Sequence, residues 1–190
     1  MLEQPRLQRL LRDLAKRDDG GYKRPMQAAL LCVEHAQETL VRHGLQRQVQ
    51  AVEALTVVKT YVRTDLGQPA CFAAAQEAHG AAKRKTREAW RTGAEDNPGA
   101  RVAILFSKAT GSLAEAAAGG FTYERADHYC IMRAMHRACL CANLAQGFAD
   151  DGDPGPEGAW QEKLLSEMAG VFVCQLDPDL PRFRPSSLTE

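Results

Sequence analysis

The chain has 190 residues, and its 24 Lys and Arg balance its 24 Asp and Glu, so the formal net charge is zero. This balance argues against a uniformly basic nucleic-acid coat protein and against an acidic disordered chain. The length suits a single domain with a sizeable core. Ala and Leu, which favour helices, number 30 and 20, whereas Val and Ile, which favour strands, number only 10 and 2. The composition therefore predicts an all-α protein.

The zero net charge is the sum of two unlike parts. Residues 1–150 carry 21 Lys and Arg against 16 Asp and Glu, whereas residues 151–190 carry 3 against 8. A mildly basic helical body is therefore expected beside an acidic C-terminal part. Overall neutrality does not exclude a basic face that is offered to an acidic partner.

Neither a secretion signal nor a membrane span is expected from the sequence. The first residues, MLEQPRLQRLLRDLAKR, carry a charge every few positions. The longest uncharged run, 138–149, contains Asn143, Gln146 and Gly147, and it is shorter than the roughly 20 apolar residues that a span needs. The six cysteines form no CxxC pair, which excludes zinc-ribbon and thioredoxin motifs. We expect a cytoplasmic protein with buried free thiols.

Apolar residues at helical spacing predict the elements in chain order. The expected helices span 5–18, 22 or 25 to 43, 46–66, 69–90, 99–118, 122–148 and 159–174. Asn97 is expected to cap the fifth helix, with Pro98 in its first turn. The acidic, Pro- and Gly-rich segment 150–158 is expected to be a loop. The sequence thus predicts an antiparallel bundle of six or seven helices, forming one domain over 1–176, with a Pro-rich tail over 177–190.

The sixth predicted helix carries a row of soft or borderline metal ligands. His128, Met132 and His136 recur at every fourth residue, and Cys139 follows three residues later on the same face. Such ligands suit copper or zinc. The competing interpretation is a core stripe of Met and Cys, with the histidines at its polar margin. Because no ligand set can be identified on a second helix, no cofactor is expected. The alternative is a helical bundle that binds copper, zinc or a small ligand through these residues of the sixth helix.

His79 is the main candidate for a partner or ligand contact. It lies among alanines, on a helical stripe with Phe72, Ala75 and Ala82. Such a histidine either orients a neighbouring helix through a hydrogen bond or contacts a partner. Glu77 is two residues away and faces elsewhere, so the two are not expected to form a catalytic pair. No Ser-His-Asp, Cys-His or phosphate-loop pattern is found, so no catalytic residue is predicted and an enzyme is not favoured.

The second half of the fourth predicted helix is basic. Residues 83–91 hold five Lys and Arg side chains together with Trp90, a combination that can contact nucleic acid. A solvated helix end, with cations near the C-terminal dipole, is the alternative. Glu88, Glu95 and Asp96 dilute the positive charge. Nucleic-acid binding is therefore not favoured.

Two segments, ALLCVEHAQETL and VEALTVVKTYVRTDLGQPACFAAAQEAHGAA, resemble the Imm-5-like family of bacterial immunity proteins. The similar parts are a Cys-Ala-Glu-type helix at 32–40, a helix that ends in a charged-x-Gly turn at 52–67, and an Ala-rich helix with His79 at 70–82. The resemblance covers about residues 28–118. It implies an all-α protein that blocks a partner toxin by binding, without catalysis. We therefore expect a non-enzymatic protein that binds another protein, and we leave a homodimer open.

Overall fold

The computed structural model describes residues 5–16, 23–45, 51–119, 125–148 and 155–170, and within these ranges it has seven helices and no strand. The helices are α1 (Pro5–Lys16), α2 (Lys23–Arg42), α3 (Val52–Thr64), α4 (Gln68–Thr92), α5 (Pro98–Ala118), α6 (Arg125–Ala145) and α7 (Gly155–Met168). The predicted all-α bundle is confirmed. Within the described ranges, no helix is both long and apolar enough to cross a membrane.

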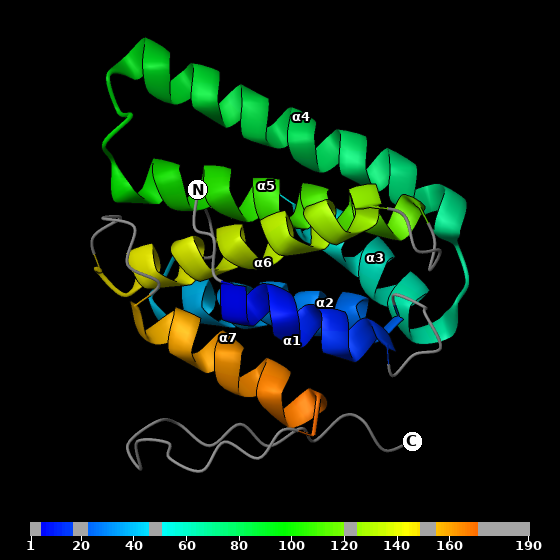
Figure 1. Cartoon of the computed structure of the whole chain (residues 1–190). Coiled ribbons are helices and arrows are strands. Elements are labelled where there is room, and N and C mark those ends of the chain that lie inside the picture. The colour runs from blue at the N-terminus through cyan, green and yellow to red at the C-terminus, as the bar shows by residue number, and fades with distance from the viewer. Residues whose placement is uncertain (1–4, 17–22, 46–50, 120–124, 149–154, 171–190) are drawn as a thin grey trace.

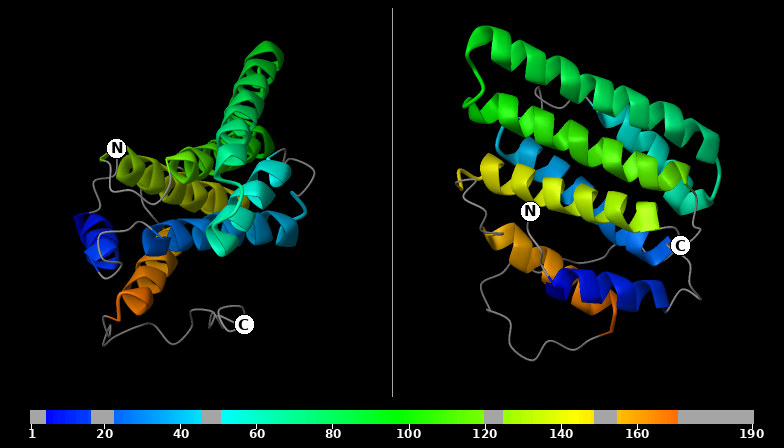
Figure 2. Two further views of the ribbon diagram at one scale, coloured as in Figure 1. Left: turned by 90° about the vertical axis from the view of Figure 1, so that its right-hand side faces the viewer. Right: turned by 45° about the horizontal axis from the view of Figure 1, so that its top comes forward.

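Helix α5 lies between α4 and α6 (Figure 1). These three helices lie side by side and alternate in direction (Figures 1 and 2). Helix α6 packs in turn on α2, and α3 packs against α4 and α5. Helices α1 and α7 contact each other and α2 on the side of the bundle away from α4 (Figure 1). Val102, Phe106 and Leu113 of α5 are fully buried. Small residues such as Ala103 and Gly111 fill the rest of its buried surface, which lets neighbouring helices approach closely.

Helix α4 projects from the rest of the bundle, as the left panel of Figure 2 shows. Its buried residues are Cys71, Ala74, Ala75, Ala78, Ala81, Ala82 and Ala89. Of the residues that share the predicted stripe with His79, Ala75 and Ala82 are buried, whereas Phe72 is 62% exposed. The reason is that α4 packs on one side only, and Phe72 lies outside the narrow alanine stripe that makes this contact.

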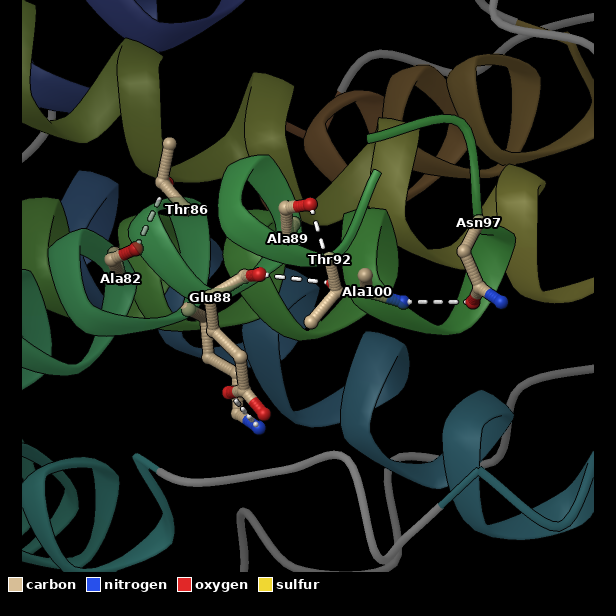
Figure 3. Close-up of polar contacts among 8 residues, drawn as sticks. Ala82, Thr86, Glu88, Ala89, Thr92, Asn97 and Ala100 are labelled. Atoms are coloured by element: carbon tan, nitrogen blue, oxygen red, sulfur yellow. Dashed lines mark hydrogen bonds and ion pairs between the residues drawn. The ribbon is translucent and has the colours of Figure 1, made fainter. Parts of the chain in front are cut away.

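The connection between α4 and α5 is short and well defined by hydrogen bonds. Asn97 Oδ1 accepts from the backbone N–H of Ala100 at 3.2 Å, and Pro98 is the first residue of α5, as predicted (Figure 3). In the last turns of α4, Thr86 Oγ1 donates to the carbonyl of Ala82 at 2.8 Å (Figure 3). The tight turn holds the C-terminal half of α4 beside the start of α5.

The boundaries of α7 differ from the prediction. The helix begins at Gly155, inside the segment that was expected to be a loop, and it ends at Met168 instead of residue 174. Pro156 is tolerated because a first-turn residue needs no N–H donor, and Glu157 favours the positive end of the helix dipole. The backbone N–H of Glu157 is bonded to Asn143 Oδ1 at 3.3 Å. The tail over 177–190 and the predicted helix starts at 46–50 and 122–124 lie outside the described residues.

Candidate functional site

A solvent-open groove of about 580 Å³ lies where α4, α5 and α6 meet. Its lining residues come from all three helices: His79, Ala82, Lys83, Thr86, Arg87, Lys108, Glu115, Arg133 and Arg137. Lys83 and Arg87 are one helical turn apart on α4, and Arg133 and Arg137 are one turn apart on α6, so each pair shares a face. Five cationic side chains therefore line the groove, with a single carboxylate among the lining residues that the structure describes.

The guanidinium of Arg137 is held in place by α5. Its Nη1 donates to Ser112 Oγ at 2.7 Å and to the backbone carbonyl of Lys108 at 3.1 Å. The other α6 cation that lines the groove, Arg133, has its Cζ 5.2 Å from the centroid of the Tyr129 ring. These contacts fix the positions of two guanidinium groups along one wall of the groove.

The cations of the groove are crowded against one another. Burial lowers the pKa of Lys108, and the nearby charges of Arg137 and Arg133 lower it further. Burial also lowers the pKa of Arg137, and Arg133 adds to this effect while Glu115 opposes it. The positive charges of Lys108, Arg133 and Arg137 thus repel one another, and a bound anion would relieve this repulsion.

His79 and Glu115 lie together at one end of the groove. His79 Nε2 is 2.9 Å from Glu115 Oε1, an ion-pair distance, although the contact lacks the alignment of a hydrogen bond. Cys130 Sγ approaches the other oxygen, Oε2, at 3.6 Å. The imidazole packs so closely on Gly111 that a Cβ there would lie 2.6 Å from His79 Cε1. Because the carboxylate lies between thiol and imidazole, these groups do not form the thiol–base pair that nucleophilic catalysis needs.

The four candidate metal ligands on α6 do not converge on a described site. His128 lies in α6, but its side chain is outside the described residues. Met132 is partly buried against the core, His136 is half-buried, and Cys139 is buried, with burial raising the pKa of its thiol to about 12. Among the described residues, no group of three or more His, Cys, Asp or Glu is arranged to hold a metal ion. The copper or zinc site stays a prediction.

A second polar cluster attaches α7 to the bundle. His35 Nε2 of α2 is 3.0 Å from Glu157 Oε2, and Gln146 Nε2 donates to the other carboxylate oxygen. The His35 ring stacks on Trp160, with ring centroids 4.0 Å apart and an interplanar angle of 14°. Gln161 Nε2 also donates to the carbonyl of Met135 at 2.9 Å. Since both oxygens of the buried carboxylate have partners, this cluster fastens a helix and offers no open site.

Sequence reasoning identified only part of the groove. It singled out His79 and the basic run 83–91, and the structure brings Lys83 and Arg87 of that run together with His79. It missed Lys108, Glu115, Arg133 and Arg137. The four-residue spacing of Arg133 and Arg137 is visible in the sequence, but the face of α6 that packs on α5 is not.

Comparison with known proteins returned no match, whether with family models, curated proteins or solved structures. The resemblance to the Imm-5-like family therefore stays a prediction.

Proposed function

We propose that this protein is a non-enzymatic binding protein whose groove between α4, α5 and α6 holds a phosphate-bearing anion. The observation that carries the proposal is the convergence of five Lys and Arg side chains from three helices on one concave surface. Guanidinium groups match the geometry of phosphate oxygens and can bind them with two parallel hydrogen bonds. The groove volume of about 580 Å³ lies in the range typical of small-ligand sites.

Preorganisation of the groove supports an anion ligand over an ordinary solvated surface. Surface cations usually point into water and keep apart, whereas Arg137 is held at the groove wall by two hydrogen bonds to α5. A side chain that is already ordered loses less entropy when a ligand binds. The mutual repulsion of Lys108, Arg133 and Arg137 is relieved by a ligand with two or more negative charges.

The protein partner that we expect from the sequence could also bind at this groove. An acidic surface of a partner protein would compete with a phosphate-bearing ligand for these cations. The immunity role that the family resemblance implies remains a prediction, and no contact in the described residues favours a toxin over another acidic partner. Binding of a small phosphate-bearing ligand is the function that the groove geometry supports best.

Calorimetric titration with inorganic tripolyphosphate at low salt tests the proposal. We expect saturable binding at one site, which weakens steeply as salt is added. The double variant Lys108→Gln and Arg133→Gln should bind at least about tenfold more weakly, because each charge-assisted hydrogen bond to an anion contributes roughly 1.5–3 kcal/mol. The matched control is Arg84→Gln, an exposed α4 cation that does not line the groove. Absence of binding to the wild-type protein, or equal losses in the control, would overturn the proposal.

A further inference from the structure

A second hollow of about 320 Å³ adjoins the groove along α4. It is lined by Thr86, Arg87, Trp90 and Arg91, and the first two of these residues also line the groove. Trp90 is 76% exposed, whereas the other tryptophan, Trp160, is only 8% exposed. A large aromatic ring that remains in water beside a cationic groove is a ready platform for a flat ligand.

We propose that the ligand of the groove is a mononucleotide, with its phosphates among the groove cations and its base stacked on Trp90. This inference rests on the proposed function and names the class of ligand. Every nucleobase has a flat face that stacks on an aromatic side chain, and arginines next to the ring add cation–π attraction. Arg87 and Arg91 flank Trp90 on the same hollow.

Along one face of α4, the cations proposed to bind the phosphates are followed by Trp90, the residue proposed to stack on the base. Lys83, Thr86, Arg87 and Trp90 follow one another at helical spacing along one face. From Lys83 to Trp90 the helix rises about 10 Å, so one ligand can place its phosphates in the groove and its base on Trp90. Arg87 lies between the two regions and lines both hollows, so it is placed to contact the phosphate nearest the sugar.

The charges at the two ends of this surface favour a mononucleotide over a nucleic-acid strand. Glu115 lies at the His79 end of the groove. Beyond Trp90, the exposed Glu95 and Asp96 stand in the turn to α5. A longer polyanion would meet carboxylates at either end. Sequence-tolerant binders of single strands also stack successive bases on several aromatic rings, whereas the described part of this surface holds one tryptophan.

The test compares the calorimetric affinities of ATP and inorganic tripolyphosphate for the whole chain. We expect the wild-type protein to bind ATP about tenfold more tightly, because only ATP carries a base. Trp90→Ala should abolish this preference and leave tripolyphosphate affinity unchanged, and Trp90→Phe should retain most of it. Phe72→Ala is the matched control, because it removes another exposed α4 aromatic that lines neither hollow.

The outcomes separate this inference from the proposed function. If tripolyphosphate binds but ATP binds no more tightly, or if Trp90→Ala leaves the preference intact, the base platform is wrong and the anion groove stands. If neither ligand binds, the groove proposal fails as well. A ten-nucleotide strand of dT that binds more than tenfold more tightly than ATP would overturn the mononucleotide assignment in favour of single-stranded nucleic acid.

Discussion

His79 of α4 and Glu115 of α5 face each other, with Nε2 and Oε1 2.9 Å apart, across the most extensive helix–helix interface of the described residues. The side chains are 25% and 41% exposed, so the pair itself contributes little to stability. Its effect is positional. It places the carboxylate beside Cys130 at the end of the groove, where its charge partly offsets the mutual repulsion of Arg137 and Arg133.

Gly111 determines whether this pair can form. A Cβ at position 111 would lie 2.6 Å from His79 Cε1 inside a packed interface, whereas a Cβ at Gly80 would meet only the flexible end of Arg84, at 3.3 Å. Both glycines are in helices, so both substitutions to Ala gain helix propensity of up to about 1 kcal/mol. We expect Gly111→Ala to be about 2 kcal/mol less stable than Gly80→Ala in urea unfolding, because overpacking outweighs that gain. Equal stabilities would show that the imidazole is not held against α5.

Removal of one groove cation should stabilise the fold while weakening anion binding. Burial and the neighbouring arginines lower the pKa of Lys108, so its charged form is less favourable in the folded chain than in the unfolded chain. This cost is present at pH values below the lowered pKa and disappears as the pH rises through it. Lys108→Gln should therefore raise the melting temperature by about 2 °C. Lys85→Gln, which loses an exposed contact with Glu88, should not. A lowered melting temperature for Lys108→Gln would contradict the idea that Lys108 is repelled by Arg133 and Arg137 in the folded chain.

The helices could be predicted because each depends on residues close together in the sequence. The groove could not be predicted, since it depends on how the helices pack on one another. Asn97 and Pro98 start α5 by capping chemistry that is written in adjacent residues. The composition around Gly155 and Pro156 is typical of a loop, yet both residues belong to the first turn of α7. Glu157 in that turn is held by Asn143 of the preceding helix and by His35 of α2, contacts that composition does not reveal. Likewise, the place of Arg137 in the groove follows from the packing of α6 on α5, which residue spacing along α6 alone does not specify.

Two buried thiols of α6 should make the protein sensitive to alkaline pH. Burial raises the pKa of both Cys139 and Cys141 from an ordinary 9.0 to about 12. A raised folded-state pKa gives stability that is complete below about pH 9 and is lost as the pH rises towards 12. We expect urea unfolding free energies to fall over this window, and to fall less steeply in Cys141→Ala. The half-buried Cys130→Ala is the control, and identical slopes for the two variants would rule out the buried thiol as the cause.

The contact between α7 and α2 should depend on the buried carboxylate of Glu157. Glu157→Gln removes the negative partner of His35 and disturbs the bond from Gln146, so we expect a loss of about 2–3 kcal/mol in unfolding free energy. Glu167→Gln, which alters an exposed carboxylate on the same helix, should change stability by less than about 0.5 kcal/mol. Hydrogen exchange locates the effect: amides of α7 should exchange faster in Glu157→Gln, while those of α4 and α5 keep their protection. Faster exchange across all helices would mean that the cluster supports the whole core and not the attachment of α7.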